Sequence, residues 1–133
     1  MDTQVAESEL DILIVEDEID ICYLLSGILK KKNLKIAYVA TLAEAQKAIE
    51  VKNPNILFLD NHLPDGFGMD FIPIVKKEYP STRIVMITAH DTSADKDKAM
   101  TRGADYFIGK PFTREIINTT IDAMLPSLKM TTS

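Results

Sequence analysis

Short apolar runs alternate along the chain with segments in which apolar residues recur at helical spacing. The five apolar runs are Leu10–Val15, Leu34–Val39, Asn55–Leu59, Arg83–Thr88 and Ala104–Ile108. Nearly continuous apolar runs are typical of strands buried on both faces of a parallel sheet. Their strict alternation with helices predicts an α/β protein with helices on both faces of the sheet. Right-handed crossovers favour a flavodoxin-like, doubly wound sheet of five parallel strands in the order 2-1-3-4-5, with five helices.

Local signals mark where several of the helices begin and end. Thr41 caps the second helix, and Glu44, three residues on, stands where a capping-box partner is expected. Thr113 caps the last helix, and Pro126 should limit it, because proline cannot donate the hydrogen bond of a helix interior. The fourth helix, at about 94–102, has few apolar residues and therefore little surface to bury.

Length and composition are those of one folded domain. The 133 residues are enough for one domain with a core, and the 46% hydrophobic and 26% charged content is typical of soluble globular proteins. We expect a disordered lead-in at 1–9, the domain at 10–126 and a C-terminal tail at 127–133. No signal-peptide pattern and no apolar run near the ~20 residues of a membrane span is present. We therefore expect a cytoplasmic protein that does not contact a membrane.

Net charge and cysteine content exclude two further classes of site. The formal net charge of −5 disfavours direct nucleic-acid binding, which needs clustered lysines and arginines. The chain has one cysteine, Cys22, so an intramolecular disulfide and a thiolate metal cage are excluded. Cys22 lies within an apolar helical pattern, and we expect its thiol to be buried and unreactive.

Chemically active side chains stand at the carboxyl ends of four of the apolar runs. Glu16 and Asp17 follow the first run, Asp60 ends the third, Thr88 ends the fourth and Lys110 follows the fifth. In an open parallel sheet, ligands bind at this edge. Three carboxylates that meet there would repel one another unless a cation such as Mg²⁺ lies between them. The set therefore predicts a site for a divalent cation and a phosphoryl group.

Asp60 is the candidate nucleophile, because a carboxylate can accept a phosphoryl group as an acyl phosphate. Lys110 can pair with Asp60 and then with a phosphoryl oxygen, and the Thr88 hydroxyl can donate to another oxygen. Taken singly, each residue has an ordinary structural explanation, such as an acidic residue at a helix N-terminus or a lysine on the surface. Their coincidence at one sheet edge favours a functional site.

The residues of this site stand in segments that resemble the receiver domain of two-component response regulators. The matching segments are IVEDE at 14–18, LFLDNHLPDGFG at 57–68, IVMITAH at 84–90 and GADYFIGKPF at 103–112. The resemblance extends from about Leu10 to Leu125, and the spacing between the segments also fits. It implies the flavodoxin-like fold and a signalling module, with no enzymatic activity beyond its own phosphorylation and dephosphorylation.

The resemblance also implies a role for each residue of the site. The implied ligands of Mg²⁺ or Mn²⁺ are Glu16, Asp17, Asp60 and the backbone carbonyl of His62. Asp60 is also the implied phosphoacceptor. The implied phosphate-binding and switch residues are Thr88, Ala89 and Lys110, with Phe107 as the aromatic switch residue. The resemblance further implies a cis peptide bond before Pro111, which X-Pro bonds adopt at low cost.

Two histidines follow the key residues at the same offset. His62 stands two positions after Asp60, and His90 stands two positions after Thr88. In receiver domains these positions line the entrance to the phosphorylation site, so the resemblance implies that both tune dephosphorylation. The alternative is two exposed loop imidazoles without a role. A zinc site is disfavoured, because no further His or Cys ligand stands nearby.

The implied partners follow from the same resemblance. The phosphoryl donor would be a histidine kinase or a phosphotransfer domain. Phosphorylation would change the face formed by the fourth helix, the fifth strand and the fifth helix, which would bind a downstream protein or an output domain. A phosphorylation-dependent dimer is also compatible with it, and neither nucleic acid nor membrane is expected as a direct partner.

Three other functions remain open from the sequence. An aspartate-nucleophile phosphatase of the haloacid-dehalogenase type would carry its nucleophile on the first strand and an aspartate where His62 stands. A flavodoxin-like electron carrier would need a phosphate-binding loop after the first strand, where the sequence EDEIDI is acidic. A phosphate-silent docking module would not require the acidic pair, Asp60, Thr88 and Lys110 together.

Overall fold

The computed structural model of the chain describes residues 10–30, 32 and 34–130 and contains one parallel five-stranded sheet in the order β2-β1-β3-β6-β7. The strands of this sheet are β1 (Asp11–Val15), β2 (Lys35–Val39), β3 (Ile56–Asp60), β6 (Arg83–Thr88) and β7 (Tyr106–Gly109). The helices are α1 (Ile19–Lys30), α2 (Leu42–Val51), α3 (Gly68–Glu78), α4 (Ser93–Arg102) and α5 (Arg114–Met130). Counted along the sheet alone, the strand order is the predicted 2-1-3-4-5, and the flavodoxin-like fold is confirmed.

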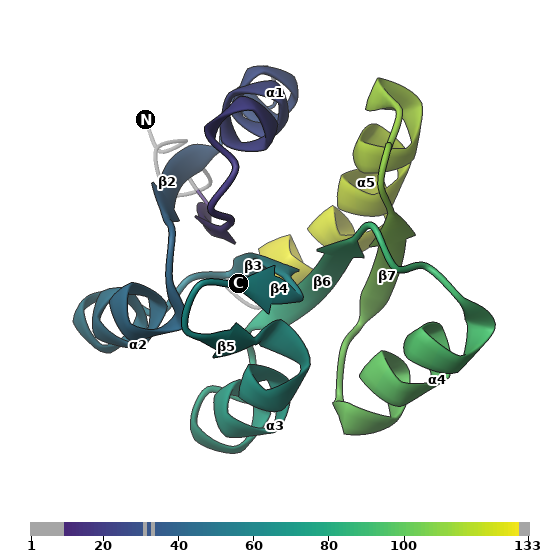
Figure 1. Cartoon of the computed structure of the whole chain (residues 1–133). Helices are drawn as coiled ribbons and strands as arrows, with labels where there is room; N and C mark the ends of the chain where they lie inside the picture. The colour runs from purple at the N-terminus through teal and green to yellow at the C-terminus, as the bar shows by residue number, and fades with distance from the viewer. Residues whose placement is uncertain (1–9, 31, 33, 131–133) are drawn as a thin grey trace, which may run out of the picture.

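The helices cover both faces of the sheet, with α1 and α5 on one face and α2, α3 and α4 on the other (Figure 1). Successive residues of one strand alternate between the two apolar layers. On β1, Ile12 and Ile14 pack beneath α1 and α5, whereas Leu13 and Val15 pack on the opposite side. Because β1, β3 and β6 each face a core on both sides, their sequences show apolar runs instead of an apolar–polar alternation.

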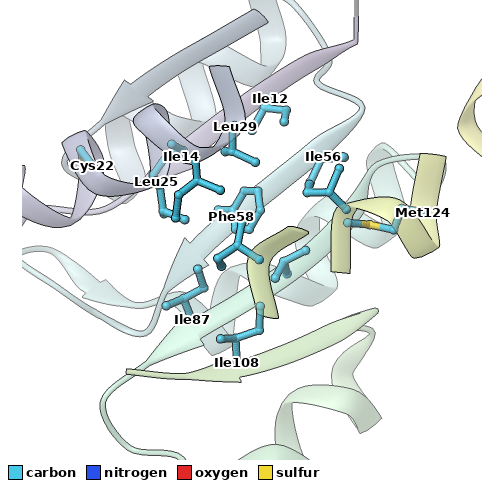
Figure 2. Close-up of a cluster of buried hydrophobic side chains, with 14 of the residues drawn as sticks. Ile12, Ile14, Cys22, Leu25, Leu29, Ile56, Phe58, Ile87, Ile108 and Met124 are labelled. Carbon is cyan, nitrogen blue, oxygen red and sulfur yellow. The ribbon is translucent and has the colours of Figure 1, made fainter. Parts of the chain in front are cut away.

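The apolar layer beneath α1 and α5 surrounds the ring of Phe58 at the centre of the sheet. Figure 2 shows this ring among side chains from β1, α1 and β6, such as Ile14, Leu25 and Ile87. Cys22 belongs to the same layer and is 1% exposed, so its expected burial is confirmed. Burial and the negative charge of Glu16 raise the pKa of the Cys22 thiol to about 11, which keeps it protonated and unreactive at neutral pH.

Side chains satisfy the free backbone groups at the start of α2. Thr41 caps the helix as predicted, and its Oγ1 accepts a hydrogen bond from the Glu44 N–H at 3.1 Å. The Glu44 carboxylate accepts from the Ala40 N–H at 2.9 Å, one residue earlier than the usual capping-box partner. Asp65, from the loop after β3, accepts from the N–H groups of Leu42 and Ala43. The loop after β3 is therefore tied to α2.

The last helix corrects one expectation, because α5 continues through Pro126 to Met130. Residues 127–130 are therefore helical, and the predicted tail boundary is wrong. Pro126 lies on the exposed side of α5, and losing one helix hydrogen bond there is offset by packing beyond it. Leu128 is 6% exposed in the apolar core, and Ser127 Oγ accepts from Arg83 Nη2 at 2.9 Å. The expected lead-in at 1–9 and the residues 131–133 lie outside the described residues.

A small hairpin follows β3, in a segment whose proline, aspartate and glycines indicate turns. It consists of β4 (His62–Leu63) and β5 (Gly66–Phe67), which pair antiparallel. The hairpin leads directly into α3 and carries His62 beside the carboxyl end of the sheet. Among the described residues, no helix is long and apolar enough to cross a membrane.

Candidate functional site

The carboxyl ends of the parallel strands bring the predicted site residues together. An open pocket of about 310 Å³ lies there, lined by Asp17, Glu18, Asp60, His62, Ala89, His90 and Lys110. Glu16 and Thr88 lie beneath this lining, 4% and 0% exposed. Phe107 is half-buried on β7 and packs against the apolar layer beneath α2, α3 and α4. The peptide bond between Lys110 and Pro111 is cis.

Three carboxylates form an acid cluster, defined here as Glu16, Asp17 and Asp60. Each offers one oxygen, and these oxygens all lie within 4.8 Å of one another. Asp17 is exposed, whereas Glu16 and Asp60 are buried. Magnesium prefers hard oxygen ligands and retains several waters. A cluster with two buried carboxylates and one solvent-facing carboxylate fits that requirement.

The Lys110 ammonium lies between the acid cluster and a fourth carboxylate. Its Nζ is 2.8 Å from Glu16 Oε1, 3.1 Å from Glu18 Oε1 and 3.5 Å from Asp60 Oδ1. In this state Lys110 therefore pairs more closely with Glu16 than with Asp60. The contact with Glu18 was not predicted from the sequence, where its only signal is a third acidic residue after the first strand.

Burial dominates the electrostatics of the acid cluster. Desolvation raises the pKa of Asp60 and of Glu16, although Lys110 acts in the opposite direction on both. Burial alone would lower the pKa of Lys110, but hydrogen bonds to Glu16 and Glu18 outweigh it and raise that pKa. One ammonium thus remains protonated beside an excess of carboxylates, and a bound divalent cation would favour their ionised forms.

The backbone after Asp60 is held in place by the next residue, Asn61. The Asn61 N–H donates to Asp60 Oδ1 at 2.9 Å, which orients the carboxylate. The Asn61 side-chain oxygen accepts from the Met69 N–H, and its backbone carbonyl accepts from the Gly68 N–H. A Cβ at Gly68 would collide with the Asp60 carbonyl oxygen, so only glycine allows this close approach. The sequence signal for this arrangement is the pairing of asparagine with glycines in DNHLPDGFG.

The Thr88 hydroxyl is engaged by the loop that follows it. Thr88 Oγ1 accepts a hydrogen bond from the His90 N–H at 3.1 Å, and the Thr88 carbonyl accepts from the Lys110 N–H at 2.8 Å. The hydroxyl is fully buried and lies at the end of β6, in the strand next to that of Asp60. Thr88 therefore joins the loops after β6 and β7 through its own side chain and backbone.

The two histidines of the chain, called here the histidine pair, lie against each other at the pocket. The ring centroids of His62 and His90 are 4.5 Å apart, with the ring planes inclined at 40°. The ring of His62 also meets that of Phe67 edge-on, with ring centroids 5.5 Å apart. Both histidine side chains are exposed. The sequence placed each histidine near a key residue but did not indicate that the two rings are in contact.

Comparison with known proteins gives the family context of this geometry. The family model of the response regulator receiver domain matches residues 12–122. The nitrogen assimilation regulatory protein NtrX of Azorhizobium caulinodans is 34% identical over 122 residues, which are 90% of this chain and 27% of NtrX. The KDP operon transcriptional regulatory protein KdpE of Escherichia coli is 30% identical over 102 residues, covering 77% of this chain and 45% of KdpE. The chain thus spans less than half the length of these two regulators.

Solved structures give the same result for the fold. The receiver domain of NtrX from Brucella abortus superposes with a TM-score of 0.79 at 32% identity, covering 85% of this chain and 96% of that domain. A CheY-like receiver domain protein from Methanospirillum hungatei superposes with a TM-score of 0.85 at 26% identity, covering 92% of this chain and 98% of the other. The likeness therefore extends over nearly the whole described domain.

Proposed function

This chain belongs to the response regulator receiver domain family, and we propose that it works as a phosphorylation switch with Asp60 as the phosphoacceptor. One observation carries the proposal: a buried aspartate lies within an acid cluster and 3.5 Å from a lysine ammonium. Phosphoryl transfer depends on positioning and charge neutralisation more than on covalent chemistry by the protein. The acid cluster and the lysine ammonium offer both positioning and charge neutralisation around the Asp60 carboxylate.

In the proposed reaction, one Asp60 carboxylate oxygen attacks the phosphorus of a phosphohistidine. The new O–P bond replaces the P–N bond to the donor imidazole, which leaves with the electron pair and takes a proton from solvent. Glu16, Asp17, Asp60 and the His62 backbone carbonyl would hold Mg²⁺ or Mn²⁺, which would neutralise charge on the phosphoryl oxygens. Lys110 would then exchange part of its contact with Glu16 for a phosphoryl oxygen. The donor would be a histidine kinase or a phosphotransfer domain.

Thr88 couples the phosphoryl group to the rest of the domain in this proposal. To donate to a phosphoryl oxygen, the Thr88 hydroxyl would move toward Asp60 and give up its contact with the His90 N–H. That change would release the loop after β6 and let Phe107 repack on β7. Helix α4 buries only Ala99 among its described side chains, so it can shift at low cost. The α4–β7–α5 face would then bind a downstream protein or output domain.

The histidine pair stands where water must approach a phosphorylated Asp60. Both rings line the pocket together with Asp60 and Ala89. We propose that His62 and His90 set the lifetime of the acyl phosphate by ordering or excluding the attacking water. The lifetime should therefore change when either ring is removed, which can be measured by the decay of phosphorylated protein in His62→Ala and His90→Ala.

The alternative functions considered from the sequence find less support. The nucleophile of a haloacid-dehalogenase phosphatase would stand on the first strand, whereas Asp60 ends β3, and the family match is to receiver domains. A phosphate-silent docking module would not need a buried acid cluster that is costly without a cation. The family is generally one of signalling modules, and no enzymatic activity is proposed.

The test is intact-mass measurement after incubation with acetyl phosphate and Mg²⁺. We expect one added phosphoryl group on the wild-type chain and none on Asp60→Asn or in the presence of EDTA. Beryllofluoride binding distinguishes a short-lived acyl phosphate from a chain that cannot be phosphorylated. Absence of both the added mass and beryllofluoride binding would overturn the proposal.

A further inference from the structure

The fold brings the two histidines of this chain to one place from separate loops. His62 lies on β4, in the hairpin after Asp60, and His90 lies in the loop after β6. Their ring centroids are 4.5 Å apart, and both side chains are exposed. Two imidazoles in contact, with room to rotate, can turn one nitrogen each toward a shared ion.

Each histidine is also positioned from outside the pair. Phe67 on β5 meets the His62 ring edge-on at 82°, which limits how far that ring can swing away. The backbone N–H of His90 donates to Thr88 Oγ1, and this hydrogen bond holds the backbone of His90 in place. The contact between the rings therefore follows from two anchored segments.

We propose that His62 and His90 form a second metal site, which takes a borderline divalent cation such as Ni²⁺ or Zn²⁺ through one ring nitrogen of each residue. Imidazole suits these metals, whereas Mg²⁺ prefers the oxygen ligands of the acid cluster. Rotation of exposed rings already in contact can bring both nitrogens to the ~2.0–2.1 Å that a Zn–N bond requires. The two sites therefore differ in ligand chemistry.

Water in the pocket can supply the remaining ligands that a two-histidine site lacks. Asp17 and Glu18 line the pocket together with both histidines, and water molecules that complete the coordination of the ion could hydrogen-bond to these carboxylates. The surplus of carboxylates over the single ammonium of Lys110 also attracts a cation to this mouth. Cys22 does not compete as a ligand, because its thiol is buried. The site would therefore hold the ion through two imidazole nitrogens and water, with the nearby carboxylates adding favourable charge.

This site would act on the switch, a consequence that rests on the proposed function. An ion bridging His62 and His90 would stand over the opening that leads to Asp60, and a phosphodonor must pass through that opening. We expect Ni²⁺ to slow phosphorylation of Asp60 while Mg²⁺ remains bound at the acid cluster.

The test is a calorimetric titration of the full chain with Ni²⁺ in the presence of millimolar Mg²⁺, combined with proton NMR of the imidazoles. Because the chain has two histidines, paramagnetic broadening of both ring signals places the ion at this pocket, and the variants then distinguish the histidine pair from the acid cluster. His62→Gln and His90→Gln should each weaken Ni²⁺ binding by roughly tenfold or more, because the second ligand then no longer acts intramolecularly.

Glu16→Gln is the matched control, since it changes the acid cluster by the same kind of substitution beneath the pocket lining. It should leave the Ni²⁺ affinity nearly unchanged. If Glu16→Gln abolishes Ni²⁺ binding and the histidine variants do not, the ion occupies the acid cluster and the proposal is wrong. Phosphorylation of wild-type Asp60 is measured separately without Ni²⁺. Its failure would overturn the proposed function and leave the metal-binding result standing.

Discussion

Helices α5 and α4 flank the same edge strand, β7, but they are attached to the domain in opposite ways. Helix α5 buries Ile117, Ile121, Met124 and Leu128 in the apolar layer centred on Phe58. Helix α4 buries only Ala99 among its side chains, and most of its other residues are exposed. Because burial of apolar surface supplies most of the stability, α5 belongs to the cooperative core and α4 to the parts that can open locally.

Under the proposed function, this difference would allow one small domain to be both stable and switchable. The layer beneath α1 and α5 keeps the sheet intact, while α4 is held by the Thr92 cap, the ion pair between Arg102 and Asp70, and one buried alanine. Arg102 of α4 contacts Asp70 of α3 at 2.8 Å, but exposed pairs of this kind contribute little. Movement of α4 would therefore leave the apolar layer beneath α1 and α5 undisturbed.

The largest expected effect is on the α5 side. Ile121→Ala should lower the free energy of unfolding by about 2–5 kcal/mol, because it removes a fully buried side chain and leaves a cavity. Urea denaturation followed by circular dichroism measures the change. A loss comparable to that of a surface substitution would show that α5 does not belong to the cooperative core.

The second prediction concerns the acid cluster at the carboxyl ends of the strands. Asp60→Asn should raise stability at neutral pH in the absence of divalent cations, because burial penalises the ionised carboxylate. The folded pKa of Asp60 lies above its unfolded value, so wild-type stability falls as pH rises through that interval. The amide of the variant cannot ionise, and the difference between the two proteins should vanish at a pH below both values. Urea midpoints across pH measure this, and a lower midpoint for the variant at neutral pH would contradict it.

Magnesium should reverse which of these two proteins is more stable, so that the wild-type protein becomes the more stable one. A ligand that binds only the folded state adds about 2.7 kcal/mol at a concentration 100 times its dissociation constant. Wild-type protein should gain this stability, and Asp60→Asn, which lacks one ligand of the acid cluster, should gain much less. Thermal denaturation with and without Mg²⁺ provides the measurement. Equal gains in both proteins would place the ion elsewhere.

The two helices also carry matched caps, which allow a smaller but more discriminating test. Thr92 Oγ1 accepts from the Asp95 N–H, and Thr113 Oγ1 accepts from the Ile116 N–H, both at 3.1 Å. Replacing either threonine by alanine should cost about 1 kcal/mol. Thr92→Ala should accelerate amide exchange within α4 alone, whereas Thr113→Ala should lower the stability of the whole domain. Global destabilisation by Thr92→Ala would contradict the local opening of α4.

The smallest effect is expected for Met100→Ala on α4. Met100 is 39% exposed, so truncation removes few contacts and should change the unfolding free energy by less than about 0.5 kcal/mol. Ile121→Ala is the corresponding truncation of an apolar side chain on α5. If Met100→Ala proved as costly as Ile121→Ala, the two helices would be equally attached.

The parts of the fold that the sequence predicts are those set by local pattern. Strands buried on both faces appear as apolar runs, and parallel strands bring their carboxyl ends to one edge, so Asp60, Thr88 and Lys110 could be grouped. The hairpin of His62–Leu63 and Gly66–Phe67 was missed, because two-residue strands have no periodicity. The continuation of α5 was missed because it depends on the burial of Leu128, a tertiary contact that outweighs the local effect of proline.

The pairing of side chains within the site could not be predicted from the sequence, because it also depends on tertiary contacts. Lys110 lies closer to Glu16 and Glu18 than to Asp60, and this choice depends on the relative positions of three loops. The approach of Gly68 to the Asp60 carbonyl depends on how α3 packs, and spacing along the chain does not show it.

The capping of α2 by Asp65 has a consequence for the direction in which a signal travels. The loop after Asp60 is fastened at both ends, through Asp65 to the start of α2 and through Asn61 to the start of α3. The loop after Thr88, by contrast, leads into the weakly held α4. Strain created at Asp60 would therefore be resisted on one side and released on the other. Under the proposed function, a change at Asp60 would thus be transmitted toward α4 and not toward α2.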